Sequence, residues 1–239
     1  MECIDTVAFL HIAAFVVYVI MAVMVFKKKP RTETSVRFFL FFIFLAAISI
    51  DRIFLHNPCI DIESAYIVYR IFAFFWAALP PLAFLIALGI SDREKLAKNP
   101  FLITGLAVYT GFMTILHIYP GIHELKPVEF GFAAVEKGFW GSVYYFADWA
   151  VIWGVAFLMG LTAITSGDRR KREQSRIILL FSLLGIILMF VTAKARMIWF
   201  LAGSADLLLI FAAVGIMLAV KYYGLLDEND GGQPRDFEE

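Results

Sequence analysis

Long apolar runs separated by short polar connections dominate the pattern along the chain. A helix that rises about 1.5 Å per residue needs roughly twenty apolar residues to cross a hydrocarbon layer about 30 Å thick. The runs lack the period-two alternation of barrel strands, and a backbone in lipid must satisfy its own hydrogen bonds. The pattern therefore predicts an all-α fold, a bundle of seven transmembrane helices near residues 7–26, 37–55, 64–90, 100–118, 142–165, 177–200 and 205–223.

Composition and the placement of basic residues add a location and an orientation. Hydrophobic residues make up 61% of the chain, against about 45–50% in soluble domains. Lys and Arg cluster after the first, third, fifth and seventh runs, whereas the opposite connections hold only Lys126 and Lys137. Because cytoplasmic loops retain basic residues, we expect a multi-pass protein of the cell (inner or cytoplasmic) membrane, in contact with lipid, with its N-terminus outside and its C-terminus inside.

Several functional classes lack their sequence signatures. The chain has no Gly-rich phosphate loop, no metal-binding Cys/His cluster and no nucleophile elbow, which predicts a protein that is not an enzyme and has no cofactor. The formal net charge is zero, and no basic stripe points to nucleic acid.

The last run lacks a central lysine that could hold retinal. GxxxG is absent from every run, so this motif gives no support for a homodimer. A homodimer formed by other contacts stays open. His117 and His123 flank Pro120 and Gly121, so they could meet around a turn. Two roles stay open for them: a pair of metal ligands, or histidines that only form hydrogen bonds.

Both cysteines are expected on the outer face. Cys3 precedes the first run and Cys59 follows the second. The outside of a cell is the oxidising side, which permits a disulfide between them. Two free thiols remain the alternative, because the sequence does not give the separation of the two Cα atoms.

Ionisable residues inside the runs are the main candidates for function, because each is costly in hydrocarbon. With alternating helix directions, all of them fall in the outer half of the membrane. Such a gathering favours one water-filled cavity that opens outward and takes a small polar or anionic ligand. Lys194 and Arg196 are about 200° apart around a helix, so only one of them can face it. The predicted ligand-binding residues are Asp51, Arg70, Tyr144, Asp148, Lys194, Arg196 and Asp206.

A structural explanation of the same charges stays open. Arg70 with Asp148, and Asp51 with Lys194, would then be buried ion pairs that fix helix register. In the third run, Pro80 and Pro81 each remove a backbone donor, which predicts a kink near residues 77–80. That kink is compatible with a hinge or with a static bend.

Three stretches together resemble the N-terminal seven-transmembrane sensor region of membrane histidine kinases. They are Tyr69-Arg70 with the run to LPPLAFLIALG, then FWGSVYYFADWAVIWGVAFLMGL followed by RRKREQSRIILLFSLLGIIL, and finally VKYYGLLD at 220–227. The resemblance implies that residues 1–223 form a sensor domain that signals through its last helix to a cytoplasmic signalling domain or partner protein. Residues 224–239 are acidic and lack a hydrophobic period, which predicts a short disordered cytoplasmic tail. Kinase activity is not implied, because the phosphotransfer motifs are absent.

Two other functions compete with the sensor. A small secondary carrier for an organic anion would use the same charges, although carriers usually place their site near the midplane between repeated halves. A scaffold for another membrane protein would use the charges only for packing.

Overall fold

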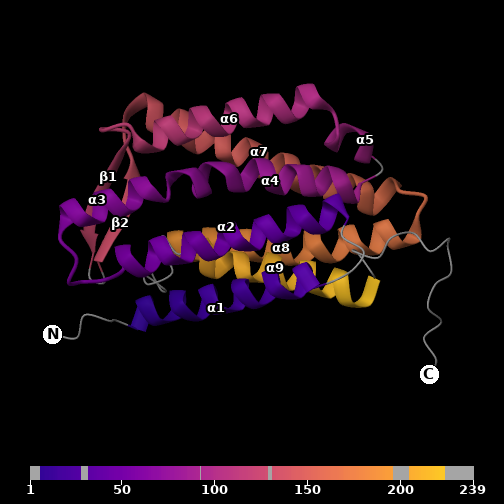
Figure 1. Cartoon of the computed structure of the whole chain (residues 1–239), viewed down its shortest axis with the longest axis horizontal. Helices are drawn as coiled ribbons and strands as arrows, with labels where there is room; N and C mark the ends of the chain where they lie inside the picture. Colours follow the sequence, from indigo (N-terminus) through magenta and orange to yellow (C-terminus); the bar gives the residue numbers. More distant parts are fainter. Residues whose placement is uncertain (1–5, 28–31, 92, 129–130, 196–204, 224–239) are drawn as a thin grey trace.

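The fold is a bundle of helices that run nearly parallel to the longest axis of the molecule (Figure 1). The structure is a computed structural model and describes residues 6–27, 32–91, 93–128, 131–195 and 205–223. In chain order its elements are α1 (Thr6–Lys27), α2 (Glu33–Leu55), α3 (Ile62–Ile71), α4 (Ala73–Ile90), α5 (Glu94–Ala97), α6 (Pro100–Ile118), β1 (His123–Val128), β2 (Gly131–Glu136), α7 (Gly138–Thr165), α8 (Arg169–Ala195) and α9 (Ala205–Tyr223).

The helices have the length and composition of membrane spans. Among the described residues, five segments are long and apolar enough to cross a membrane, namely α1, α2, α3 together with α4, α6 and α7. Two further helices follow: α8, of 27 residues, and α9, which contains the shorter apolar stretch Leu209–Val220. The chain is therefore mostly helical, and its apolar helices indicate a multi-pass membrane protein.

Polar residues mark where several helices begin. The hydroxyl of Thr32 accepts a hydrogen bond from the Ser35 amide at the start of α2. A carboxylate oxygen of Asp61 accepts one from the Ser64 amide at the start of α3. Asn99 caps α6 in the same way, directly before Pro100. Each cap satisfies a backbone donor that the first helical turn leaves without a partner.

The helices pack around α2 and α4. In Figure 1, α6 and α7 lie on one side of α4, and α1, α2, α8 and α9 lie on the other. The interior is aromatic and aliphatic, with Tyr18 of α1 and Phe38, Phe42 and Leu45 of α2 fully buried. At Gly215 of α9 an added Cβ would lie 2.7 Å from the Cβ of Phe181. The absence of a side chain at Gly215 therefore lets α8 and α9 approach closely.

The outward faces of the bundle are apolar. Phe101 of α6 is 87% exposed, and Val108, Ile115, Phe146 and Phe157 also stand out from the surface. Monomeric soluble proteins rarely expose large contiguous apolar patches. These faces are therefore suited to lipid rather than to water.

A β-hairpin interrupts the helical pattern, so the all-α prediction is wrong for residues 123–128 and 131–136. Strands β1 and β2 pair antiparallel, with His123 opposite Glu136 and Leu125 opposite Ala134. Within β1 only His123 and Leu125 are buried. Two alternating buried positions are too few to predict a strand from the sequence. The hairpin also lies in a connection between apolar runs, where no regular element was expected.

The third run is broken at Phe72 rather than at its prolines. Phe72 ends α3 and precedes α4, with φ −88° and ψ 0°. Helix α4 continues through Pro80 and Pro81. This break was not expected from the sequence, and the kink near residues 77–80 stays a prediction, because a helix that continues through prolines can still bend.

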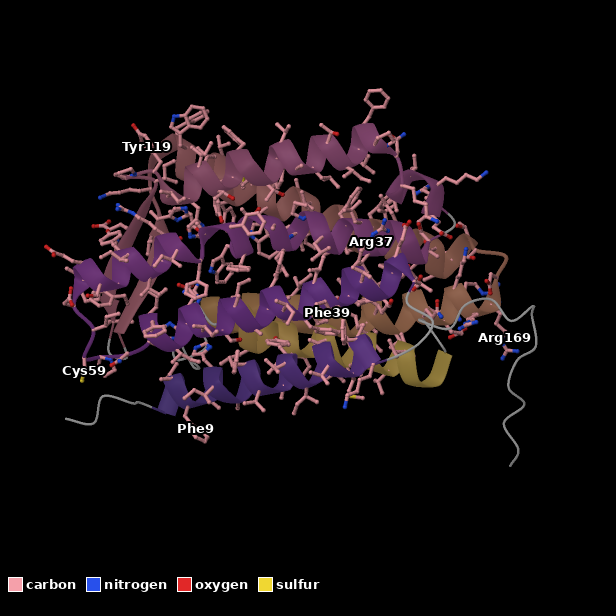
Figure 2. All side chains as sticks on the ribbon, in the orientation of Figure 1. Phe9, Arg37, Phe39, Cys59, Tyr119 and Arg169 are labelled. Carbon is pink, nitrogen blue, oxygen red and sulfur yellow. The ribbon has the colours of Figure 1, made fainter. Side chains whose placement is uncertain are left out.

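The two ends of the bundle differ in chemistry. Cys59 and Tyr119 lie at the end that carries the hairpin, whereas Arg37 and Arg169 lie toward the other end (Figure 2). Arg37 of α2 donates hydrogen bonds to the carbonyls of Leu85 in α4 and Ala97 in α5. One guanidinium thus joins three helices near the end opposite the hairpin.

Candidate functional site

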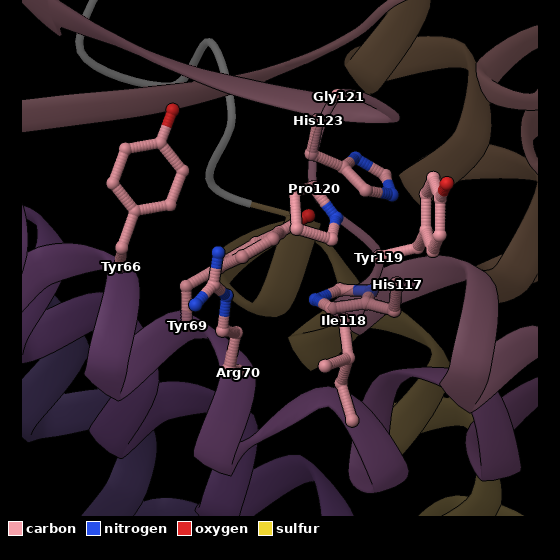
Figure 3. A pocket seen from close by; sticks show the side chains of 9 residues that line it. All are labelled: Tyr66, Tyr69, Arg70, His117, Ile118, Tyr119, Pro120, Gly121 and His123. Atoms are coloured by element: carbon pink, nitrogen blue, oxygen red, sulfur yellow. The ribbon is translucent and has the colours of Figure 1, made fainter.

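A cavity of about 130 Å³ lies at the hairpin end, between α3, the end of α6 and the turn that leads into β1. Its deep wall, called the floor below, consists of Tyr69, His117 and His123, which are at most 7% exposed. Its mouth is formed by Arg70, Tyr119 and Pro120, which are exposed. Figure 3 shows these side chains around the shared space. The complete lining is Tyr66, Tyr69, Arg70, His117, Ile118, Tyr119, Pro120, Gly121 and His123.

The floor is a cluster of packed rings. Tyr69 stacks on His117 with ring centres 4.2 Å apart, and the ring centres of His117 and His123 are 4.9 Å apart. Tyr144 of α7 lies behind them, with its ring centre 4.8 Å from that of His123. Side chains from three separate elements, α3, α6 and α7, therefore meet around the start of β1.

The floor carries hydrogen-bonding atoms that have no partner in the described part of the chain. They are Nε2 of His117 and both ring nitrogens of His123. Nδ1 of His117 lies 2.9 Å from the hydroxyl oxygen of Tyr144. When Tyr144 donates this hydrogen bond, the neutral imidazole of His117 carries its proton on Nε2. Buried polar atoms are nearly always satisfied in folded proteins, so these nitrogens are suited to a ligand or to ordered water.

Arg70 supplies the positive charge at the mouth. Its guanidinium carbon lies 5.7 Å from the centre of the Tyr66 ring, within the range of a cation–π contact. The hydroxyl of Tyr66 accepts a hydrogen bond from the backbone amide of Leu125 in β1. Among the described side chains, no carboxylate lies within 4 Å of Arg70. Arg70 is thus held beside the cavity with its charge unneutralised.

The remaining predicted site residues take separate positions. Of the seven, Arg70 lines the cavity, and Tyr144 supports its floor through His117. Asp148 lies one turn further along α7, where it accepts a hydrogen bond from the Tyr109 hydroxyl at 2.9 Å. No ion pair joins Arg70 to Asp148 in the described residues. The side chains of Lys194, Arg196 and Asp206 lie outside the described part of the structure.

Asp51 belongs to a second polar cluster, inside the bundle. It is fully buried and accepts a hydrogen bond from the indole N–H of Trp76 at 3.0 Å. Nε of Arg52 lies 3.9 Å from the same carboxylate, and the guanidinium carbon lies 4.6 Å from the Trp76 ring centre. The charges of Asp51 and Arg52 therefore largely compensate each other. Asp51 is not part of the cavity lining.

The hairpin also contacts the end of α2. Gly131 has φ +126°, and an added Cβ would lie 2.9 Å from the Cα of His56 and overlap the carbonyl oxygen of Leu55. Nδ1 of His56 lies 2.7 Å from Nε2 of His11 in α1. Burial, together with the charge of Arg52 and the neighbouring His11, lowers the pKa of His56 from 6.5 to about 2. One hairpin thus touches both the cavity, through His123, and the junction of α1 with α2.

The cysteine and metal predictions have different outcomes. Cys59 is disulfide-bonded, but Cys3 lies outside the described residues, so their pairing stays a prediction. Within the described ranges, no group of three or more His, Cys, Asp or Glu side chains is arranged to hold a metal ion. His117 and His123 do lie together, but as a pair.

The sequence reasoning did not assign a ligand-binding role to the residues of the floor. The sequence predicts for His117 and His123 either a metal pair at the turn or simple hydrogen bonding, and Tyr69 enters only through the family resemblance. The spacing of the two histidines around Pro120 and Gly121 was the available signal. The packing of both rings against Tyr69 depends on the hairpin, which the sequence pattern did not reveal.

Comparison with protein-family models, with curated proteins and with solved structures finds no match for this chain.

Proposed function

We propose that this chain is a seven-helix membrane sensor module that receives a small extracytoplasmic ligand in the cavity at its hairpin end. Its N-terminus lies outside and its C-terminus inside the cell membrane, and α8 and α9 supply the sixth and seventh crossings. It signals through α9 to a cytoplasmic domain or partner protein such as a histidine kinase. The resemblance of its helices to the sensor region of such kinases supports this output.

The observation that carries the proposal is the cavity with its buried histidine nitrogens beneath the exposed Arg70. Ligand sites combine a concave, partly apolar wall with a few convergent polar groups. Here the wall consists of tyrosine rings, and the polar groups are His117, His123 and Arg70. If these residues served only as ion pairs that fix helix register, Arg70 would have an acidic partner among the described side chains.

The distribution of basic residues supports the orientation. The described connections at the end opposite the hairpin carry Arg93, Lys95 and Lys98 between α4 and α6, and a basic segment begins α8 at Arg169. The hairpin end carries Lys126 and Lys137, and Lys137 pairs with Glu124 at 3.2 Å. By the positive-inside rule, this distribution supports a cavity on the outer face.

A contiguous series of contacts leads from the cavity to the last helix. His117 of α6 is joined to Tyr144 of α7, α7 packs against α8, and α8 packs closely along α9. A ligand that changes the position of His117 would therefore act on α7 first. Signalling requires that the ligand bind two arrangements of these helices with different affinity.

The proposal is testable without knowing the ligand, by occupying the cavity covalently. In nanodiscs, Tyr119→Cys would be modified with a negatively charged methanethiosulfonate reagent, which leaves the disulfide-bonded Cys59 unmodified. Hydrogen–deuterium exchange would then be measured in Leu209–Val220 of α9. Phe139→Cys is the matched control, because Phe139 is 73% exposed near the same end but does not line the cavity.

We expect modification at position 119, but not at position 139, to change exchange in α9. Equal exchange with and without the modification at 119 would remove the support for a sensor. Uptake of radiolabelled benzoate by proteoliposomes of the unmodified protein would instead favour the anion carrier. Benzoate is chosen because its size suits the cavity.

A further inference from the structure

The charges around the cavity restrict the ligand to an anion or a neutral molecule. Arg70 is the one permanently charged side chain among the nine lining residues, and no acidic residue belongs to the lining. A cation would therefore meet a guanidinium without a counter-charge. An anion would give Arg70 the partner that it lacks among the described residues.

The geometry of Arg70 favours a carboxylate. A guanidinium presents a planar fork of N–H donors that matches the two oxygens of a carboxylate, which gives two parallel hydrogen bonds. The Tyr66 ring lies against the guanidinium, and Tyr66 is itself fixed by its hydrogen bond to the amide of Leu125. This arrangement limits where the fork can point and leaves its donors accessible at the mouth.

The floor favours a second hydrogen-bonding group on the ligand. Nε2 of His117 and the two nitrogens of His123 are buried and unpartnered in the described chain. A neutral imidazole has one N–H donor and one acceptor nitrogen, so a ligand hydroxyl can accept from one of these rings and donate to the other, whereas a carbonyl oxygen can only accept. The rings of Tyr69 and His117, 4.2 Å apart, form a flat wall beside the path from mouth to floor.

Size and charge restrict the ligand further. A cavity of about 130 Å³ is close to the roughly 150 Å³ that accommodates benzene in another protein. This suits a ligand of about six to ten non-hydrogen atoms, the longer ones reaching to the mouth. Burial lowers the pKa of His123 from 6.5 to about 4, so His123 is neutral at pH 7. The single charge of Arg70 matches a monoanion better than a phosphate of charge about −1.5 to −2.

We propose that the cavity binds a small monocarboxylate, with its carboxylate on Arg70 and a hydroxyl or carbonyl group on His117 and His123. This assignment rests on the proposed sensor function, because that function makes the cavity the ligand site. It names the chemical class of the stimulus, which neither the helix pattern nor the resemblance provides.

The test is equilibrium binding of 4-hydroxybenzoate to the full chain in nanodiscs, measured by calorimetry. We expect Arg70→Gln to weaken binding at least about tenfold, since it removes a charge-assisted pair. Arg70→Lys should restore part of the loss, because it keeps the charge but not the fork. Lys126→Gln is the matched control: Lys126 is also an exposed base on the hairpin side, but it does not line the cavity. This control should leave binding unchanged.

Comparison probes examine each element of the assignment. The neutral 4-hydroxybenzyl alcohol should bind at least about tenfold more weakly, and benzoate, which lacks the hydroxyl, should bind more weakly than 4-hydroxybenzoate. The proposal is overturned if no carboxylate binds, if the alcohol binds equally well, or if Zn²⁺ binds independently of Arg70 and excludes the carboxylate.

The two proposals fail separately. Carboxylate binding that depends on Arg70, with no response of α9 to cavity modification, would support the ligand class and remove the sensor. A response of α9 to modification at position 119, with no carboxylate binding, would support the sensor and overturn the ligand class.

Discussion

Gly131 offers a sharp test of how the hairpin is seated on the bundle. Its φ of +126° is a conformation that residues with a Cβ rarely adopt, and an added Cβ would overlap the Leu55 carbonyl oxygen and come 3.1 Å from the Asn57 amide nitrogen. Gly121 also has a positive φ, +93°, but an added Cβ there meets nothing within 4 Å. Comparing Gly131→Ala with Gly121→Ala therefore separates backbone strain from collision.

The expected magnitudes differ accordingly. The strained backbone costs about 1–2 kcal/mol in either variant. Gly131→Ala also forces β2 away from the end of α2, and such overpacking adds about 1–3 kcal/mol, because the neighbours are backbone atoms that cannot rotate aside. We expect losses in the free energy of unfolding of about 1–2 kcal/mol for Gly121→Ala and about 2–5 kcal/mol for Gly131→Ala.

Thermal unfolding in one fixed detergent would measure the difference, since each kcal/mol corresponds to about 2–4 °C at this chain length. Hydrogen–deuterium exchange of β1 and β2 provides a second readout, and Gly131→Ala should raise it more than Gly121→Ala. Equal changes in the two variants would show that the hairpin does not rest on the end of α2, and the contact described above would then be wrong.

Two further predictions concern buried polar groups. The pKa of His123 is lowered from 6.5 to about 4 by burial, so its contribution to stability is complete above pH 6.5 and is lost as the pH falls toward 4. Between pH 7 and pH 5, wild type should lose about 2 kcal/mol more than His123→Gln, whereas Lys126→Gln should keep the wild-type slope in unfolding curves. Trp76→Phe removes the N–H that donates to Asp51 and should lower the free energy of unfolding by about 1–3 kcal/mol. If thermal unfolding shows a loss below about 0.5 kcal/mol, this hydrogen bond contributes little to stability.

The helices were predictable because each apolar run is long enough to span a membrane and to satisfy its backbone hydrogen bonds within one helix. The expected run at 100–118 coincides with α6, and that at 205–223 coincides with α9. The break at Phe72 was not predictable, because Phe is compatible with a helix and its conformation depends on what surrounds it.

The candidate site was only partly predictable. Arg70 stood out because a charge within an apolar run needs an explanation. Its grouping with Asp51 was based on depth alone, and depth does not say which way a side chain points. Asp51 faces Trp76 inside the bundle, whereas Arg70 faces the hairpin. His117 and His123 come together through a turn and two short strands, for which the hydrophobic pattern has almost no signal.

The interruption at Phe72 makes α3 a short rod that meets α4 at a joint, while contacts with α2 and β1 hold the rest of it in place. Arg70 is two residues from this joint, and Tyr66 is further out on the same rod. Because Tyr66 and Tyr69 fasten α3 to the hairpin and to α6, a ligand between Arg70 and the histidines would bear on all three elements at once.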